Sequence, residues 1–142
     1  MSASPDVLRA RILVVDDQQC NLRLLEFALR RAGYVGVAST SEPMEVCALQ
    51  GLNDYALIIL DLQMPQMNGF QVMEELRKIE CGKRIAILVL SADPAQKTRA
   101  LAAGAASFLS KPFVLAEVVE RVHDLLDAGR VLRPDPPVLR AA

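Results

Sequence analysis

Residues 56–70 read ALIILDLQMPQMNGF, and the apolar run at the start of this stretch ends in a single carboxylate, Asp61. The run Ala56–Leu60 lacks the alternation of apolar and polar residues that marks a half-exposed strand. It therefore predicts a strand buried on both faces, as in a parallel sheet that helices cover on both sides. A charged group at the exit of such a strand needs a chemical reason, because an unpaired charge is costly to bury.

Four further apolar runs alternate with segments whose apolar residues follow helical spacing. The five predicted strands are Ile12–Val15, Val35–Ala38, Ala56–Leu60, Ile85–Leu90 and Ser107–Leu109. One predicted helix ends at Gly33, and the others are Pro43–Leu49, Phe70–Ile79, Pro94–Ala103 and Val114–Ala128, the last of which is expected to end at Gly129. This alternation predicts an α/β fold with a doubly wound, five-stranded parallel sheet in the flavodoxin-like strand order 2-1-3-4-5.

Length and composition limit the classes of protein to which the chain can belong. A length of 142 residues predicts one domain. The formal net charge of −1 predicts no basic surface for binding nucleic acid or an anionic membrane. The three cysteines form no CxxC pair, so neither a disulfide framework nor a zinc site is expected. No signal peptide and no apolar run of about 18–20 residues is present, which favours a cytoplasmic protein.

The predicted strand order brings acidic side chains together. Asp16 and Asp17 follow the first strand and Asp61 follows the third, and these strands are neighbours in the order 2-1-3-4-5. Three carboxylates in one crevice raise one another's pKa unless a cation lies nearby. Oxygen ligands without histidine or cysteine select a hard cation, so the cluster predicts a Mg²⁺ site.

Two further polar residues leave strands at the same edge of the sheet. Ser91 follows the fourth predicted strand, and Lys111 follows the fifth. A hydroxyl, an ammonium and a metal ion around one carboxylate are the groups that neutralise a phosphoryl group during its transfer. Asp61 would then be the nucleophile, and Met64-Pro65 with Asn68-Gly69 are interpreted as shaping its loop through a fixed φ angle and a tight turn.

Four motifs carry a family resemblance: ILVVDD at 12–17, LIILDLQMPQMNGF at 57–70, LVLSA at 88–92 and FLSKPF at 108–113. Together they resemble the receiver domains of two-component response regulators, the CheY-like superfamily. The resemblance covers Arg11–Gly129. We therefore expect an N-terminal extension at 1–10, a receiver domain at 11–129 and a proline-containing tail or linker at 130–142.

The resemblance implies a role for each acidic position. Asp61 matches the phosphoacceptor, and Asp16 and Asp17 match the pair that binds Mg²⁺. Gln63 matches the residue whose backbone carbonyl completes the metal site. By this likeness the chain is a signalling domain rather than an enzyme acting on external substrates, and it takes part in its own phosphorylation and dephosphorylation.

The resemblance also implies a switch. Ser91 matches the residue that hydrogen-bonds the phosphoryl group, and Lys111 matches the lysine that pairs with it. Phe108 matches the aromatic residue that turns inward when the hydroxyl is drawn toward the phosphoryl group, and Pro112 stands where the family has a cis peptide bond. The face made by the fourth helix, fifth strand and fifth helix is expected to change on phosphorylation.

The partners implied by the family are a sensor histidine kinase or a histidine phosphotransfer protein, an output partner or output domain, and a second copy of the chain in a homodimer. Leu24 and Phe27 widen the apolar stripe of the first helix, as ordinary packing or as a docking surface for the phosphodonor. No direct contact with nucleic acid or membrane is expected.

Four other interpretations fit parts of the sequence. Asp16-Asp17 alone is typical of a helix N-cap. A phosphatase of the haloacid-dehalogenase type also uses an aspartate nucleophile, but it places a second aspartate where this chain has Gln63. The third is a receiver that no longer accepts a phosphoryl group and acts as a scaffold. This interpretation is disfavoured because all the residues that the resemblance assigns to phosphorylation are present. A dinucleotide site is disfavoured because no glycine-rich turn follows Val15.

Overall fold

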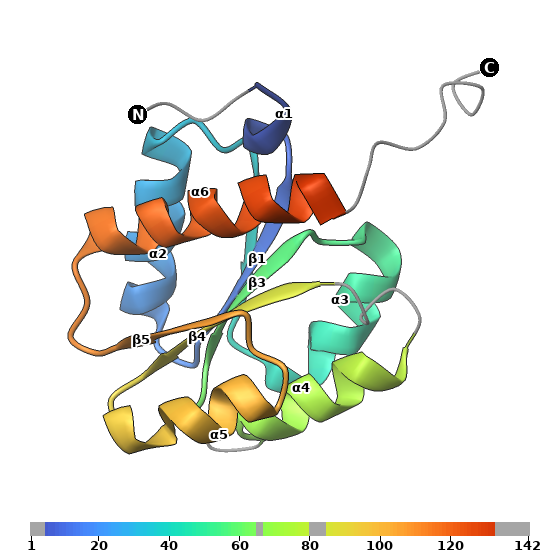
Figure 1. Ribbon diagram of the computed structural model, residues 1–142, viewed down its shortest axis with the longest axis vertical. Helices are drawn as coiled ribbons and strands as arrows, with labels where there is room; N and C mark the ends of the chain where they lie inside the picture. The colour runs from blue at the N-terminus through green and yellow to red at the C-terminus, as the bar shows by residue number, and fades with distance from the viewer. Residues whose placement is uncertain (1–4, 65–66, 80–84, 133–142) are drawn as a thin grey trace.

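A five-stranded parallel sheet forms the centre of the protein, whose computed structural model describes residues 5–64, 67–79 and 85–132. The strands are β1 (Arg11–Val15), β2 (Gly36–Thr40), β3 (Leu57–Asp61), β4 (Ala86–Ser91) and β5 (Ser107–Ser110). Their order is β2-β1-β3-β4-β5 (Figure 1). The doubly wound fold and the strand order predicted from the sequence are thus confirmed.

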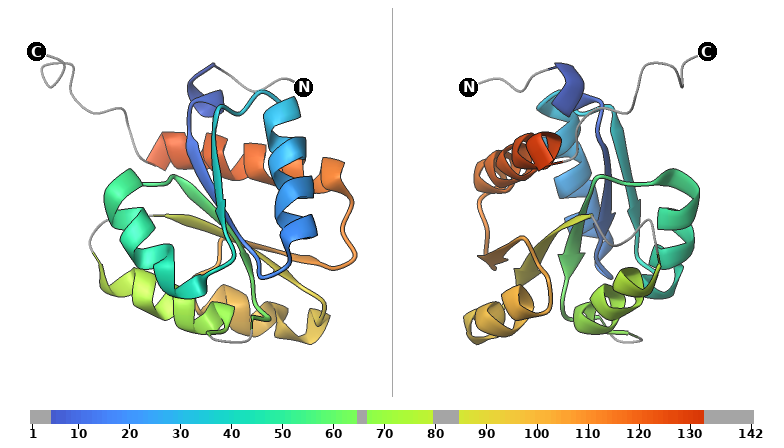
Figure 2. Two further views of the ribbon diagram at one scale, coloured as in Figure 1. Left: turned by 180° about the vertical axis from the view of Figure 1, so that it is seen from behind. Right: turned by 45° about the vertical axis from the view of Figure 1, so that its right-hand side comes forward.

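Helices cover both faces of this sheet. They are α1 (Pro5–Leu8), α2 (Gln19–Arg31), α3 (Val46–Asn53), α4 (Gly69–Lys78), α5 (Lys97–Ala102) and α6 (Leu115–Leu132). Short 3₁₀ turns, Pro43–Glu45 and Pro94–Gln96, lead into α3 and α5. Figures 1 and 2 show α1, α2 and α6 on one face and α3, α4 and α5 on the other.

The core lies in two layers because successive strand side chains point to opposite faces. All five residues of β3 are buried, which confirms the prediction from the apolar run. Ile58 and Leu60 belong to the cluster that contains residues of α3, α4 and α5. Leu57 and Ile59 belong to the cluster that contains residues of α2 and α6.

The register of the sheet aligns the carboxyl ends of four strands. Val15 of β1 pairs with Leu60 of β3, so the residues that follow them leave the sheet side by side. Asp61 pairs with Leu90 of β4. Ser91 pairs with Ser110 of β5, the residue before Lys111. Every strand-exit residue singled out from the sequence therefore lies at one edge.

Several element boundaries differ from those predicted. The α6 helix does not end at Gly129 but continues to Leu132, because one glycine inside a helix costs only about 1 kcal/mol. Gly33, in contrast, has a φ of 108° and follows the last turn of α2 as predicted. The 1–10 extension contains α1, whose Val7 is buried in the cluster with α2 and α6.

The residues after β3 form a helix start instead of the tight turn predicted at Asn68-Gly69. The Asn68 side chain accepts a hydrogen bond from the Gln71 backbone N–H, and the Gln71 side chain accepts one from the Asn68 backbone N–H. This capping box makes Gly69 the first residue of α4. Pro65 and the tail at 133–142, to which the sequence also assigns roles, lie outside the described residues.

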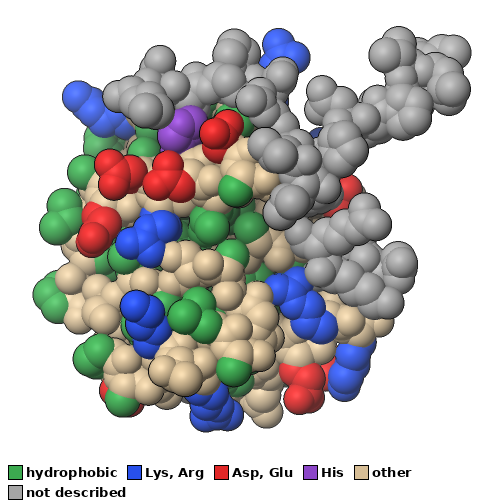
Figure 3. Space-filling model, in the orientation of Figure 1, with side chains coloured by type: hydrophobic (Ala, Val, Ile, Leu, Met, Phe, Trp, Pro, Cys, Tyr) green, Lys and Arg blue, Asp and Glu red, His purple; other side chains and the backbone are tan. Residues whose placement is uncertain are grey.

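The outer surface carries both signs of charge. Figure 3 shows acidic side chains over α6, with Lys and Arg side chains over other elements of the same face. No described helix has both the length and the apolar composition needed to cross a lipid bilayer.

Candidate functional site

Three carboxylates meet at the carboxyl edge of the sheet. Asp16 follows β1 directly and is 1% exposed, and Asp61 is the last residue of β3 and is 4% exposed. Asp17 is exposed. Each of the three offers one oxygen, and these oxygens all lie within 4.8 Å of one another. The strand order thus brings together the acidic residues that the sequence predicts to meet.

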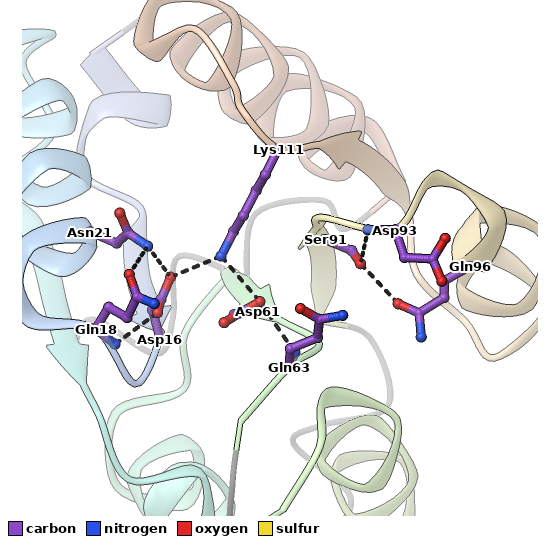
Figure 4. A network of polar contacts seen from close by, with 9 residues as sticks. All are labelled: Asp16, Gln18, Asn21, Asp61, Gln63, Ser91, Asp93, Gln96 and Lys111. Carbon is purple, nitrogen blue, oxygen red and sulfur yellow. Dashed lines mark hydrogen bonds and ion pairs between the residues drawn. The ribbon is translucent and has the colours of Figure 1, made fainter.

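Lys111 bridges two of these carboxylates from the end of β5. Its Nζ lies 3.3 Å from Asp61 Oδ1 and 3.6 Å from Asp16 Oδ2 (Figure 4). The lysine is partly buried, so its charge is screened less than that of a surface ion pair. Among the described residues of this cluster, three carboxylates lie beside one ammonium, which contacts two of them, so the cluster keeps excess negative charge.

The Asp16 carboxylate is held by the start of α2. The Gln18 backbone N–H donates to Asp16 Oδ1 at 2.9 Å, and Asn21 Nδ2 donates to Asp16 Oδ2 at 3.2 Å. The N-cap of α2 is Gln18, so the interpretation of Asp16-Asp17 as the capping residue is wrong. The sequence analysis missed Asn21, although a polar residue in the first turn after an acidic pair is a usable signal.

Burial and neighbouring charges shift the pKa of Asp61. Burial raises its pKa above the ordinary value, the ammonium of Lys111 opposes this effect, and the charge of Asp16 adds to it. The Gln63 backbone N–H donates to Asp61 Oδ1 at 3.3 Å and also favours the ionised form. The fold therefore keeps a charged group in a place where burial disfavours charge.

The raised pKa gives a prediction for stability without metal. The pKa of an unfolded aspartate is about 3.9, and the pKa of Asp61 in the folded protein is higher. The folded state therefore loses stability relative to the unfolded state as the pH rises from about 3.9 through the raised pKa. We expect Asp61→Asn in EDTA to raise the free energy of unfolding at about pH 7 by about 1–2 kcal/mol, and Tm by roughly 3–8 °C.

Urea unfolding of both proteins at about pH 7 and about pH 4.5 measures this difference. The difference in free energy of unfolding between Asp61→Asn and wild type is expected to be smaller at the lower pH, because wild-type Asp61 then carries less charge. An Asp61→Asn variant less stable than wild type at about pH 7 would contradict the assignment of Asp61 as a destabilising buried charge.

The donor set of the cluster fits a magnesium ion. The three ligand oxygens come from carboxylates, without sulfur or imidazole, and one of the carboxylates is exposed at the edge of the site. Mg²⁺ prefers oxygen ligands and keeps several waters, which suits an open cluster of few carboxylates. A divalent cation would also balance the charge that Lys111 leaves uncompensated.

Ser91 reaches the same edge, but its hydroxyl is engaged elsewhere. Its Oγ donates to Gln96 Oε1 at 2.8 Å and accepts from the Asp93 backbone N–H at 3.1 Å. Figure 4 shows these bonds on the side of Ser91 away from the Asp16 carboxylate. The structure therefore does not place the Ser91 hydroxyl on Asp61, and it adds Gln96, which the sequence analysis missed.

The remaining residues predicted from the resemblance lie close by. Phe108 is 7% exposed and belongs to the core cluster that also contains Ala100 of α5. The aromatic ring is thus already buried while the Ser91 hydroxyl is bound to Gln96. The Lys111–Pro112 peptide bond is cis, as the resemblance implies.

Curated proteins with similar sequences are regulators of gene expression and sensory proteins. The chain is 33% identical over 113 residues to the cell cycle transcriptional regulator CtrA of Caulobacter vibrioides, covering 80% of this chain and 48% of that protein. It is 34% identical over 136 residues to the sensory/regulatory protein RpfC of Xanthomonas campestris, covering 93% of this chain and 19% of that protein. The chain thus spans half or less of each of these two relatives.

Solved structures match over most of the chain. The chemotaxis protein CheY4 of Vibrio cholerae superposes with a TM-score of 0.77 at 28% identity, covering 82% of this chain and 98% of that one. The receiver domain of the sensor histidine kinase PA1611 of Pseudomonas aeruginosa, solved with a magnesium ion in its active site cleft, gives a TM-score of 0.76 at 29% identity, covering 84% and 98%.

The family assignment follows from these findings together. Residues 12–123 match the response regulator receiver domain family. This range begins in β1, ends within α6 and includes every residue of the carboxylate cluster as well as Lys111. The chain belongs to the response regulator receiver domains of two-component systems and has the CheY-like fold.

Proposed function

We propose that Asp61 accepts a phosphoryl group from a phosphohistidine, on a sensor histidine kinase or a histidine phosphotransfer protein, in the presence of Mg²⁺. One observation carries this proposal: a buried carboxylate at the end of β3 lies in contact with Lys111 and within reach of two more carboxylates. Such a site offers a nucleophile, a cation and the ligands of a hard metal.

The transfer exchanges one bond to phosphorus for another. An oxygen of the Asp61 carboxylate forms a bond to phosphorus, while the bond from phosphorus to the donor breaks and its electron pair stays with the donor atom. The leaving atom is an imidazole nitrogen of the phosphohistidine, or an acetate oxygen when acetyl phosphate is the donor. Lys111 stabilises the charge on the phosphoryl oxygens.

The carboxylates Asp16, Asp17 and Asp61 would hold the metal together with the backbone carbonyl of Gln63. When bound, Mg²⁺ supplies positive charge to the phosphoryl oxygens during the transfer. The magnesium ion in the active site cleft of the PA1611 receiver domain supports this assignment. Asn21 keeps the Asp16 carboxylate oriented toward the cluster.

Phosphorylation is proposed to act as a switch. Ser91 and Lys111 bind the phosphoryl group, Phe108 follows the movement of Ser91, and the face of α5, β5 and α6 changes its contacts. An output partner, an attached output domain or a second copy of the chain would read that face. We place this function in the cytoplasm and assign it to residues 11–129.

The phosphodonor is proposed to dock beside the site on α2. Leu24 and Phe27 are 49% and 60% exposed, so the alternative that they are ordinary core packing does not apply. They lie on the helix that begins just after Asp17, about two and about three turns along the chain from that residue. Exposed large apolar side chains next to a reactive group suit a partner surface.

The proposed function predicts a specific gain in mass. Incubation with acetyl phosphate and Mg²⁺ is expected to add one phosphoryl group to the wild-type chain, as measured by intact-protein mass spectrometry. EDTA should abolish the gain, because the carboxylate cluster then lacks its counter-charge. Asp61→Asn should show no gain under any condition.

Unchanged mass in every condition would sink the phosphoacceptor assignment and favour a receiver that acts as a phosphate-independent scaffold. A gain that persists in Asp61→Asn would move the acceptor to another residue. Phosphate released continuously from an external phosphoester would instead support the phosphatase alternative.

A further inference from the structure

The hydroxyl of Ser91 has two local partners, and one of them takes its hydrogen. It accepts a hydrogen bond from the Asp93 backbone N–H at 3.1 Å and donates its hydrogen to Gln96 Oε1 at 2.8 Å. Ser91 is 0% exposed, so no solvent competes for this hydroxyl. The bond to Gln96 joins two side chains and crosses from the end of β4 to the 3₁₀ turn before α5.

A serine hydroxyl has one hydrogen to donate. Phosphoryl oxygens only accept hydrogen bonds, so Ser91 can bind a phosphoryl group on Asp61 only by donating that same hydrogen. The bond from the Asp93 N–H uses an oxygen lone pair and does not compete for the hydrogen. The bond to Gln96 and a bond to a phosphoryl oxygen are therefore mutually exclusive.

We propose that Gln96 is a positioning residue that holds the Ser91 hydroxyl away from Asp61, and that its amide oxygen competes with the phosphoryl group for the Ser91 hydrogen. This inference rests on the proposed function and adds to it a residue that sets how readily the phosphorylated arrangement forms. In a two-state switch, an interaction present only in the resting state shifts the equilibrium toward rest.

The same bond ties α5 to the sheet. Gln96 is the N-cap residue of α5, and in this six-residue helix only Ala100 is buried. A helix with so little apolar packing depends on other contacts for its position. One is the Gln96–Ser91 bond, and another is Arg99, whose guanidinium carbon lies 3.8 Å from the centre of the Phe70 ring of α4.

Loss of the Gln96 bond would remove one hydrogen bond between the end of β4 and the start of α5, and leave the packing of Ala100 and the contact of α5 with α4. When Ser91 turns toward the phosphoryl group, the start of α5 loses its link to the end of β4. Gln96 is partly exposed, so its freed amide can hydrogen-bond water at little cost. The competition thus couples the chemistry at Asp61 to the position of α5 through two named side chains.

A double-mutant cycle with beryllofluoride, a phosphoryl mimic that binds aspartate, tests the competition. Binding to wild type, Gln96→Met, Ser91→Ala and the double variant is measured in Mg²⁺ by ¹⁹F NMR titration, with Asp61→Asn as the blank. Gln96→Met keeps the length of the side chain and removes the acceptor amide. Gln96→Ala serves as a second variant, and thermal unfolding checks that each protein folds.

We expect Gln96→Met to bind beryllofluoride about two- to tenfold more tightly than wild type, the range that one neutral hydrogen bond contributes. In the Ser91→Ala background the same substitution should change the affinity by less than about 1.5-fold, because the contested hydrogen is gone. A merely structural role for Gln96 would change both backgrounds alike.

If Gln96→Met binds beryllofluoride with the same affinity as wild type, the competition is overturned, while the proposed function is not. An equal gain with and without the Ser91 hydroxyl would overturn it too, because the effect would then not pass through that hydroxyl. Wild-type protein that takes up no beryllofluoride in Mg²⁺ would overturn the proposed function itself, and the competition with it.

Discussion

Phosphorylation of a Lys111→Met variant by acetyl phosphate is expected to be about 100- to 1,000-fold slower than that of wild type, the range for loss of one charge-stabilising donor at a reacting centre. Lys111 Nζ contacts Asp61 and Asp16 at 3.3 Å and 3.6 Å. Methionine keeps most of the apolar side chain and removes the ammonium. The rate of mass gain under saturating Mg²⁺ measures the effect.

Lys78→Met is the matched control. Lys78 is exposed on α4, and its Nζ lies 2.9 Å from Glu75 on the same helix. The control therefore removes an ion pair that includes no residue of the carboxylate cluster. Exposed pairs of this kind contribute little to stability. We expect wild-type phosphorylation rates for Lys78→Met. A Lys111→Met rate within about threefold of wild type would contradict the role given to Lys111.

Gly69→Ala is expected to destabilise the fold by about 2–4 kcal/mol and to slow phosphorylation, because α4 begins against the backbone that carries Asp61. A Cβ at position 69 would lie 2.9 Å from the Asp61 carbonyl oxygen, 2.9 Å from Leu62 Cα and 2.6 Å from Leu62 Cδ2. Two of these atoms are backbone, so either α4 or the end of β3 has to move.

Gly51→Ala provides the contrast within the same protein. Gly51 lies in α3, and a Cβ there would meet no atom within 4 Å. Alanine is the better helix former, so this variant is expected to gain about 0.5–1 kcal/mol. Urea unfolding of both variants and their phosphorylation rates give the comparison. A Gly69→Ala protein as stable and as reactive as wild type would show that the close approach has no consequence.

The helix boundaries show that a local sequence pattern does not always predict where a helix ends. Gly33 and Gly129 carry the same local signal for a helix end, yet only Gly33 adopts a positive φ, and α6 passes through Gly129 to Leu132. The short helix α1 has too few residues to show a helical period, and it places Val7 in the core beside α2 and α6. Packing against distant segments decides such cases.

In the site, the sequence predicts which residues the backbone brings together but not which side chains bond to one another. The sequence predicts that Asp16, Asp17, Asp61 and Lys111 meet, because the carboxyl ends of parallel strands share one edge and the strand order makes β1 and β3 neighbours. It does not predict Asn21 beneath Asp16 or Gln96 on Ser91. Those contacts depend on rotamers that the local pattern does not specify.

By itself the sequence determined where the five strands lie and which charged residues follow them, because the apolar runs show both. The order in which the strands pair was predicted from the common arrangements of such sheets, and the structure confirms it. Only the tertiary structure decided that the Ser91 hydroxyl bonds Gln96 and that Gly69 lies against the backbone of Asp61. Both features depend on the distance between atoms that packing brings together, a quantity that residue spacing along the chain does not contain.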